Sequence, residues 1–485
     1  MFTKQRETIV AALPWLWPAL LFALWVAPSH AQPQGEGVLL TNPHGQFVRS
    51  YEGTKTCLQC HETQAKHVFS SIHYQWRGEA PNLVNAGGKK IGKLNSTNDF
   101  CTNPSISWIA ILTNDQGKVI SNGCSKCHAG LGEKPSEQMT PAQLENIDCL
   151  LCHAPNYRRQ VVKKPNGTLG WVPTTANDPA VMLNIAQSVA RPSNETCLQC
   201  HVGSGGGLNY KRGDLETAHL RPTRDFDVHM GSGMQCIQCH KFTDHKVQGA
   251  GTQMSGMDVA NSARPQCESC HKPAPHRNAA LNRHTQAVYC TTCHIPSFAR
   301  KDPTDMHRDW SKSEAVEGQG RFEPAIELKT NVRPAYTWWN GQGEIALLNT
   351  RVKREANGKV AMYKPQGSIS DPKARIYAFK YHTGRLPIDA KTDEMIPVQV
   401  GMVFRNAANE QAVKAGAKNY LGREVSEIGW IDTERYMGLF HEVVPKEKAL
   451  TCNDCHGAAG RLDWKALGYK GDPQKVGGRR LKASS

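Results

Sequence analysis

The stretch Cys124-Ser125-Lys126-Cys127-His128 decides the fold, because the same pattern, Cys-x-x-Cys-His, occurs eight times along the chain. The motifs use sixteen of the seventeen cysteines. In such a motif the two thiols add to the vinyl groups of one haem, and the adjacent histidine ligates the iron. The sequence therefore predicts eight covalently bound haem c groups. The attachment cysteines are Cys57, Cys60, Cys124, Cys127, Cys149, Cys152, Cys197, Cys200, Cys236, Cys239, Cys267, Cys270, Cys290, Cys293, Cys452 and Cys455, and the proximal histidines are His61, His128, His153, His201, His240, His271, His294 and His456.

Two other uses of paired cysteines are weaker explanations. Zinc sites take cysteine pairs, but zinc does not require a histidine directly after every pair. Disulfides are conceivable in an exported protein, but a disulfide has no use for that histidine either. The cysteine outside the motifs is Cys101, in Asn98-Asp99-Phe100-Cys101, upstream of the second motif. An unpaired thiol near a haem-attachment site is a candidate for chemistry.

The N-terminus predicts export. Lys4 and Arg6 precede an apolar run from Leu13 to Val26, and Ser29-His30-Ala31 resembles a small-residue cleavage site. The apolar run is short for a membrane span. We therefore expect residues 1–31 to be a signal peptide that is removed, with an uncleaved anchor as the alternative. Together with the haem motifs, this indicates a protein of the bacterial periplasm.

Composition narrows the class of partner. The chain has 58 Lys and Arg against 43 Asp and Glu, a formal net charge of +15, which on its own suggests an anionic partner. Eight haems add about sixteen propionate carboxylates, which offset that excess. The chain lacks a nucleic-acid recognition motif, so nucleic acid is excluded as a partner. We expect a periplasmic or membrane-anchored electron-donor cytochrome and a small anionic substrate.

The spacing of the motifs divides the chain after the signal peptide into four parts. Residues 32–123 hold the first motif and Cys101, residues 124–294 hold six motifs, residues 295–451 hold none, and residues 452–485 hold the last motif. The haem-free part is too long for a linker. We therefore expect it to cover the haem array or to form the substrate cleft.

We predict a mainly α protein with much irregular chain, a multihaem cytochrome c fold built around eight covalent haems. Haem motifs commonly open short helices, and Gly and Pro interrupt the chain often. Hydrophobic residues make up 39% of the chain, which is low for its length. We expect a helix over Asn406–Gly416, a turn at Trp338-Trp339-Asn340-Gly341 and a strand over Gly343–Val352.

The number of histidines nearly equals the number of axial ligands that eight haems require. Of the twenty histidines, eight belong to motifs and His30 belongs to the signal peptide, which leaves eleven. An electron-transfer haem usually takes two strong axial ligands, so seven or eight of these eleven should be distal ligands. Sequence context favours His44, His73, His229, His245, His276, His284, His382 and His441, and it leaves His67, His219 and His307 over.

Several longer phrases are more specific than the motifs. They are Asn98-Asp-Phe-Cys101, Gly205-Gly-Gly-Leu-Asn-Tyr-Lys211-Arg-Gly213-Asp214, Asp227-Val-His229-Met-Gly, Leu281-Asn-Arg-His284, Cys293-His-Ile-Pro296-Ser-Phe-Ala-Arg300 and Cys452-Asn-Asp-Cys-His-Gly…Arg461-Leu-Asp-Trp-Lys-Ala-Leu-Gly-Tyr469. Through these phrases, from about His44 to Tyr469, the chain resembles the octahaem tetrathionate reductase-like cytochromes.

The resemblance implies that the second haem is the active one, with His128 as proximal ligand, Lys211 as distal ligand and Cys101 as a neighbouring thiol. It also implies a reductase that receives electrons through bis-histidine haems and reduces tetrathionate to thiosulfate, or a related small oxyanion. Three alternatives stay open: reduction of nitrite or hydroxylamine, oxidation of hydroxylamine, and a non-catalytic electron-transfer chain of haems. The Cys-x-x-Cys-Lys motif of pentahaem nitrite reductases does not occur in the sequence.

Overall fold

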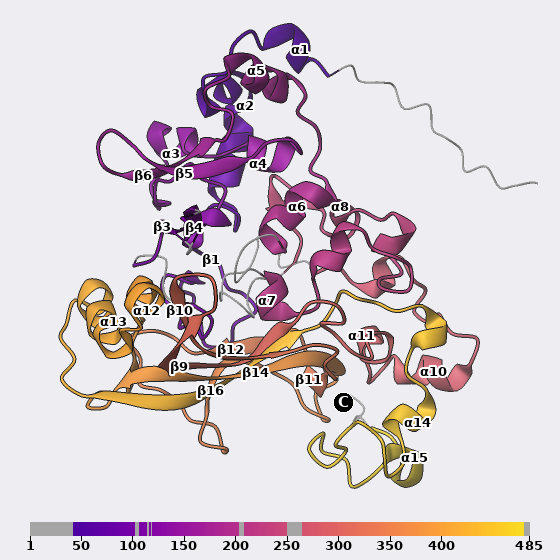
Figure 1. The fold of residues 1–485 in the computed structure, drawn as a ribbon. Coiled ribbons are helices and arrows are strands. Elements are labelled where there is room, and N and C mark those ends of the chain that lie inside the picture. The colour runs from indigo at the N-terminus through magenta and orange to yellow at the C-terminus, as the bar shows by residue number, and fades with distance from the viewer. Residues whose placement is uncertain are drawn as a thin grey trace, which may run out of the picture. The chain divides into compact units, whose positions relative to one another are not determined.

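The haem motifs lie in short helical segments. In the computed structural model, which describes residues 42–101, 106–113, 116–117, 119–202, 208–249 and 264–479, every motif begins in a helical turn or directly before one (Figure 1). One turn brings two cysteines three positions apart to the same side, where both can reach one haem. The segments are α2 (Thr54–Phe69), the 3₁₀ turn η1 (Cys124–Lys126), α4 (Leu150–His153), α6 (Asn194–His201), α8 (Cys236–Cys239), the 3₁₀ turn η4 (Cys267–Ser269), α11 (Cys290–His294) and α14 (Cys452–Cys455).

The haem-free part of the chain forms an eight-stranded sheet, so the prediction of a mainly α protein holds only in part. Alternating aromatic and β-branched residues favour strands there, and we underestimated that pattern. Six strands follow the order β10-β9-β14-β16-β13-β12, and β11 and β15 also pair with β14. The bounds are β9 (Thr304–Val316), β10 (Arg321–Lys329), β11 (Ala335–Trp339), β12 (Gly343–Ile345), β13 (Val360–Pro365), β14 (Arg375–Asp389), β15 (Glu394–Met395) and β16 (Ile428–Gly438).

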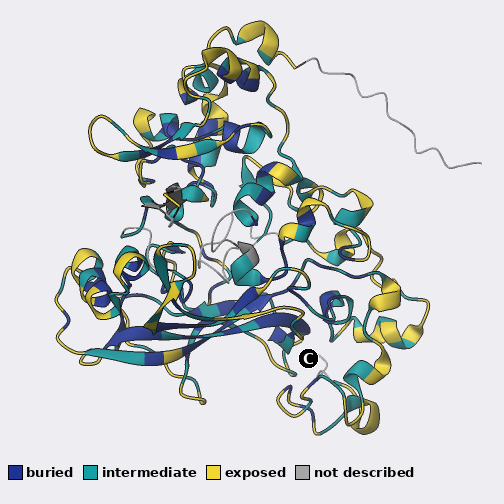
Figure 2. Ribbon diagram, in the orientation of Figure 1, coloured by how far each residue is buried: buried dark blue, intermediate teal, exposed yellow. Residues whose placement is uncertain are grey.

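Strand β14 is the centre of this sheet. It pairs antiparallel with β16 from Phe379 to Asp389, and it pairs parallel with β9 around His307. Because neighbours cover it on both sides, most of its residues are buried, including the polar Lys380 and His382. Figure 2 shows this buried band beside the more exposed haem-motif helices. A charged side chain on a central strand requires a specific partner.

Two helices pack against the sheet beside β9 and β10 (Figure 1). They are α12 (Val400–Asn406) and α13 (Asn409–Gly416), and they bury Val403 and Val413 in the largest apolar cluster. The helix expected over Asn406–Gly416 is confirmed from Asn409 onward. Ala407 adopts a left-handed conformation with a φ of 53°, which ends α12 and separates it from α13.

Two local predictions near β11 need correction. Trp338 and Trp339 do not form a turn, because both lie in β11, where they pair with β14. The chain bends at Gly341, between β11 and β12. The strand expected over Gly343–Val352 is shorter, since β12 covers Gly343–Ile345.

The remaining described elements are short. Two hairpins flank the second and third motifs, β3 (Ala110–Thr113) with β4 (Val119–Asn122) and β5 (Arg159–Lys163) with β6 (Leu169–Pro173). The others are α1 (His44–Phe47), α3 (Pro141–Glu145), α5 (Pro179–Gln187), α7 (Leu208–Arg212), α10 (Ala279–His284), α15 (Pro473–Val476), η2 (Thr217–Leu220), η3 (Met230–Ser232), η5 (Ala417–Leu421), η6 (Lys446–Lys448), β1 (Arg77–Gly78), β2 (Ile91–Gly92), β7 (Phe242–Thr243) and β8 (Lys246–Val247).

The predicted signal peptide, residues 1–31, lies outside the described residues. Among the helices that the structure describes, none is long and apolar enough to cross a lipid bilayer.

Candidate functional site

Six motif histidines face a candidate distal histidine across a gap of similar width. Two imidazoles that bind one iron from opposite sides, each with a metal–nitrogen bond of about 2 Å, place their ring centroids about 6 Å apart. The measured centroid distances fall around this value: His44–His61 5.9 Å, His153–His245 6.4 Å, His229–His271 6.1 Å, His240–His441 6.1 Å, His276–His294 6.3 Å and His284–His456 6.1 Å. These residues fit axial ligation of haem.

His73 is the histidine neighbour of the fourth motif, and it also interacts electrostatically with His128 of the second motif. Burial and the proximity of His73 lower the pKa of His201 to about 3. His73 is half-buried, and this burial lowers its pKa as well. Buried imidazoles without charge are the form that binds iron. Seven candidate histidines therefore lie beside seven motif histidines.

The assignment of His382 as a distal ligand is wrong. Its Nδ1 lies 2.8 Å from Asp99 Oδ2, and its Nε2 lies 3.2 Å from Asp305 Oδ1. Both ring nitrogens are therefore engaged by carboxylates, and neither is left to bind iron. The sequence context that favoured His382 could not reveal this, because Asp99 and Asp305 are distant in sequence.

The histidines left over by the sequence have other partners, although one of them stays close to a haem ligand. His219 Nδ1 accepts from the backbone N–H of Glu216 at 3.0 Å, and His307 Nδ1 lies 2.9 Å from Thr383 Oγ1. His67 lies 3.7 Å from Asp244, and its ring centroid is 6.4 Å from that of His245. His245 thus lies between His67 and His153.

The second motif is built differently. His128 Nδ1 lies 3.1 Å from Tyr74 O, and its ring packs 5.4 Å from that of Trp108. Lys211, on α7, interacts electrostatically with Cys101 and with Cys127 of this motif. The structure thus brings the predicted lysine and the predicted thiol together beside the second haem-attachment site.

Burial controls the acid–base state of these groups. Burial and the nearby Lys93 lower the pKa of Lys211 to about 8. Cys101 also interacts electrostatically with Cys124 of this motif. A buried lysine shifts toward its neutral amine, and the neutral amine is the form that can ligate a metal.

Hydrogen bonds from Asn98 and the sheet hold the Cys101 segment. Asn98 Oδ1 accepts from the backbone N–H of Phe100 at 3.0 Å and of Cys101 at 3.3 Å. Cys101 borders a cavity of about 20 Å³ that Trp310 and Met395 also line. A cavity of this size has room for one water molecule.

The sheet also holds the Lys211 segment. Thr304 Oγ1 donates to Tyr210 O at 2.7 Å, and Lys380 Nζ donates to Lys211 O. Gly213 has a φ of 74°, and a Cβ there would lie 2.8 Å from side-chain atoms of Thr304. The glycine two positions after the lysine is therefore needed for α7 to approach β9.

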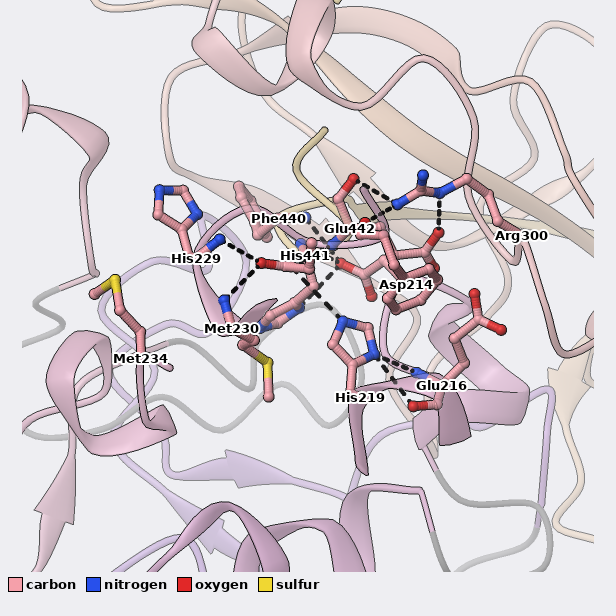
Figure 3. Close-up of polar contacts among 12 residues, drawn as sticks. Asp214, Glu216, His219, His229, Met230, Met234, Arg300, Phe440, His441 and Glu442 are labelled. Carbon is pink, nitrogen blue, oxygen red and sulfur yellow. Dashed lines mark hydrogen bonds and ion pairs between the residues drawn. The ribbon is translucent and has the colours of Figure 1, made fainter. Parts of the chain in front are cut away.

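The segment after Lys211 also contacts a candidate distal histidine, His441. Figure 3 shows Asp214, whose Oδ2 accepts from the backbone N–H of Phe440 at 2.8 Å and lies 3.3 Å from His441 Nδ1. Arg212 pairs with the other oxygen of Asp214 at 3.1 Å. Residues 211–214 therefore connect the second motif to His441, the histidine neighbour of the fifth motif.

Cysteines of neighbouring motifs interact by hydrogen bonds or electrostatically, which gives the order in which the motifs adjoin. The first motif adjoins the third, and the third adjoins the fourth. The second motif also adjoins the fourth. From the fourth motif the series continues through the fifth, sixth and seventh to the eighth. The pairs are Cys57–Cys149, Cys152–Cys197, Cys127–Cys200, Cys197–Cys236, Cys239–Cys270, Cys267–Cys290 and Cys293–Cys455.

Several buried donors beside the motifs are also suited to haem. Arg264 Nε and Nη2, Gln199 Nε2 and Trp464 Nε1 have no hydrogen-bond partner among the described residues. Gln199 lies within the fourth motif, and Arg264 lies three residues before the sixth. Haem propionates are strong acceptors for such donors. The histidine pairs and these donors together define a multihaem c-type cytochrome.

Comparison with known proteins agrees with this class. Residues 305–459 match the model of the family described as Cytochrome c bacterial. An uncharacterized protein of Archaeoglobus fulgidus is 32% identical over 232 residues, which cover 41% of this chain and 76% of that protein. The octaheme cytochrome c from Shewanella oneidensis is 32% identical, covers 91% of this chain and 100% of its own, and superimposes with a TM-score of 0.72. The chain belongs to the octahaem c-type cytochromes and carries covalently bound haem c.

Sequence reasoning missed the polar residues that hold the site. Asp99, Asp305, Arg308 and Lys380 are buried and connect the sheet to the Cys101 and Lys211 segments. The signal available was weak, because each charge stands alone among strand residues and its partner is far away in sequence.

Proposed function

We propose that this chain is a periplasmic octahaem reductase that reduces tetrathionate to thiosulfate, or a related small oxyanion, at the haem of the second motif. The observation that carries the proposal is the proximity of Lys211 and Cys101 to that motif. The other motif histidines have a histidine neighbour, which suits electron transfer rather than substrate binding.

A lysine is a suitable ligand for a haem that must open. The amine binds iron only when it is neutral, so a proton competes for the same lone pair. Burial lowers the pKa of Lys211 to about 8, which makes the neutral form far more accessible than in a solvated lysine. Substrate or a proton can then displace the amine.

Positive side chains around this motif suit a dianion. Lys93 interacts electrostatically with Lys211 and with His128, and Arg308 interacts with Lys211. Cations at short range in a buried site attract a divalent anion strongly. Tetrathionate carries two negative charges, which fits this environment.

The thiol of Cys101 supplies a route for cleavage of tetrathionate. Its thiolate attacks one of the two central sulfur atoms, a Cys101 S–S bond forms, and the central S–S bond breaks with departure of one thiosulfate. Two electrons then break the new bond, release the second thiosulfate and restore the thiolate. Overall, one tetrathionate and two electrons give two thiosulfates. The haems supply those electrons, received from a periplasmic or membrane-anchored donor cytochrome.

Steady-state assays of the purified holoprotein with tetrathionate, nitrite and hydroxylamine, with a reduced dye as donor, test the proposal. We expect Cys101→Ser to keep eight haems and to lose most turnover of tetrathionate, with a much smaller loss for nitrite. Equal losses on both substrates would assign Cys101 a structural role, and full tetrathionate activity would remove it from the reaction.

A second variant tests the ligand. We expect Lys211→Ala to leave seven haem spectra unchanged and to convert one from a low-spin, amine-ligated signal to a high-spin or water-bound signal. A spectrum identical to wild type would contradict the role of Lys211. A wild-type protein that reduces none of the three substrates would favour an electron-transfer chain without a substrate of its own.

A further inference from the structure

His382 lies at the centre of a fully buried charge network. Its side chain is 0% exposed, and Asp99 and Asp305, which flank it, are 1% and 0% exposed. Carboxylates accept hydrogen bonds, so both imidazole nitrogens must donate. Only the imidazolium form carries a hydrogen on both nitrogens. His382 is therefore a cation held between two anions.

Two arginines complete the network. Arg435 Nε pairs with Asp99 Oδ1 at 2.8 Å, and Arg308 Nε pairs with Asp305 Oδ2 at 2.8 Å. Burial favours the protonated carboxylic acids, but Arg435 and His382 hold the pKa of Asp99 well below its usual range. Against the same effect of burial, Arg308 and His382 lower the pKa of Asp305. Both aspartates are therefore charged.

One side of the network holds the thiol. Asp99 lies two residues before Cys101, and its backbone oxygen accepts from Trp310 Nε1 at 2.7 Å. The ring of Phe100, the residue directly before Cys101, lies 4.2 Å from the His382 ring. Arg308, paired with Asp305, donates to Phe100 O. The position of the Cys101 segment thus depends on both aspartates.

The other side holds the amine. Asp305 follows Thr304, whose hydroxyl accepts from Lys380 Nζ at 2.6 Å and donates to Tyr210 O at 2.7 Å. Lys380 also donates to Lys211 O. Lys380 and His382 are two positions apart on β14 and therefore project from the same face of the strand.

We propose that His382 is a positioning residue whose charge ties the Cys101 segment to the Lys211 segment. This inference rests on the proposed function, because it concerns the thiol and amine of the same site. The imidazolium bridges Asp99, on the thiol side, to Asp305, on the amine side. Without that charge the two aspartates repel each other in a buried site, so the two segments separate.

The test compares His382→Gln with His307→Gln in the haem-loaded protein. Both N–H donors of glutamine lie on one nitrogen, its other polar atom is an acceptor, and it carries no charge, so it does not replace the imidazolium between two carboxylates. His307 lies on the adjacent strand β9, and its ring contacts Thr383 rather than a carboxylate. It is therefore a control for loss of a histidine in the same sheet.

Three measurements are made on each variant: haem count by intact mass, the spectrum of the lysine-ligated haem, and the rate at which an alkylating reagent labels Cys101. We expect His382→Gln to keep eight haems and seven unchanged haem spectra, to alter the second-motif spectrum, and to change the labelling rate several-fold. In a separate steady-state assay, turnover should fall by about 10- to 100-fold through kcat, the size of effect that follows small misplacement of reacting groups. His307→Gln should match wild type in all three measurements.

A wild-type spectrum and labelling rate in His382→Gln would overturn the inference. If His382→Gln does not fold, the double variant Asp305→Asn with His382→Gln removes one anion with the cation and restores charge balance. In that variant a restored fold with an altered second-motif spectrum supports positioning, whereas a wild-type spectrum contradicts it. If wild type does not reduce tetrathionate while these spectral and labelling changes persist, the proposed function fails and the positioning role stands.

Discussion

The partner of each axial imidazole controls how strongly that histidine donates to iron. His128, His153 and His240 each place Nδ1 within 3.1 Å of a backbone carbonyl oxygen. His456 instead places Nδ1 2.6 Å from Asp472 Oδ1. A carboxylate is a stronger acceptor than a carbonyl, so the histidine of the eighth motif is the more basic ligand.

The effect of Asp472 on the eighth haem is directly testable. Asp472→Asn keeps the side-chain shape and the cap on α15, but it removes the charge beside His456. We expect the reduction potential of one haem to rise by about 40 mV, because a hydrogen-bond difference of about 1 kcal/mol corresponds to that shift for one electron. Spectroelectrochemical titration measures it.

Asp463→Asn is the matched control for this substitution. Asp463 lies in the same C-terminal segment, and its carboxylate accepts from the backbone N–H of Ala466 at 2.9 Å. Its loss should leave all eight potentials unchanged. An unshifted potential in Asp472→Asn would mean that the carboxylate does not tune the ligand. Asp214 lies beside His441 in the same way, but we expect it to affect that histidine less, since Arg212 neutralises part of its charge.

Residues that are contiguous in sequence could be predicted at these sites, whereas residues brought together only by the fold could not. The attachment cysteines and proximal histidines could be predicted because Cys-x-x-Cys-His is contiguous in sequence. Distal ligands come from elsewhere in the chain. Counting histidines against motifs limits the number of candidate distal ligands, but it does not show which motif each candidate serves. His382 entered that list wrongly, since Asp99 and Asp305 become its partners only when β9 and β14 pair.

Among the elements, the approach of α7 to β9 sets where Lys211 lies. Gly213 follows α7 with a φ of 74° and touches Thr304. We expect Gly213→Ala to lower the free energy of unfolding by about 2–3 kcal/mol, because the strained backbone is combined with a steric clash. It should also perturb the second-motif haem spectrum, since α7 must move.

Gly422→Ala distinguishes the cost of backbone strain at a glycine from the effect of moving α7. Gly422 has a φ of 69°, but a Cβ there has nothing within 4 Å. This variant should show only the smaller backbone cost, of about 1 kcal/mol, and a wild-type haem spectrum. Thermal unfolding followed by circular dichroism, together with visible spectra, distinguishes the two. Equal effects in both variants would show that the contact with Thr304 is unimportant.

The pairing of β14 with β9 and β16 also predicts how the sheet responds to acid. Arg435 and His382 hold the pKa of Asp99 below its usual range, after the opposing effect of burial. A carboxyl group whose folded pKa is depressed stabilises the fold above its unfolded pKa, about 3.9, and this stability is lost as pH falls toward the folded pKa. We therefore expect the unfolding temperature to fall steeply below about pH 5.

Asp99→Asn should reduce that slope and also lower stability at pH 7 by about 3–5 kcal/mol, because it leaves two buried cations with one partner fewer. Asp432→Asn is the control, since its pair with Arg385 on β14 is largely exposed and contributes about 0–1 kcal/mol. An acid slope in Asp99→Asn as steep as in wild type would contradict the role of this carboxylate.

The sheet itself was only partly foreseen. Residues 295–451 were expected to cover the haems or form the cleft, and the strands β9 to β16 fall within this range. Their aromatic and β-branched residues carry the signal, but polar residues such as Lys380 and His382 interrupt the alternation that marks a strand. Those interruptions are the buried charges that hold the site.

For the whole molecule, the contacts between motifs form a continuous series in which the second motif branches from the fourth. Every haem except those at the ends of the series and at the branch therefore lies between two others. Loss of a haem from an interior motif would interrupt the series, whereas loss of the first or the eighth would only shorten it.

Full occupancy has a measurable consequence. If all eight motifs are loaded, the denatured protein should exceed the mass of its polypeptide by eight haems, and an alkylating reagent should label one cysteine, Cys101, of the seventeen. Each motif without haem would lower the mass by one haem and add two labelled thiols, so mass and labelling must change together. A mass short by one haem with a single labelled thiol would mean that an unloaded cysteine pair is oxidised, and Cys101→Ser, which should abolish labelling in the loaded protein, checks the assignment of that thiol.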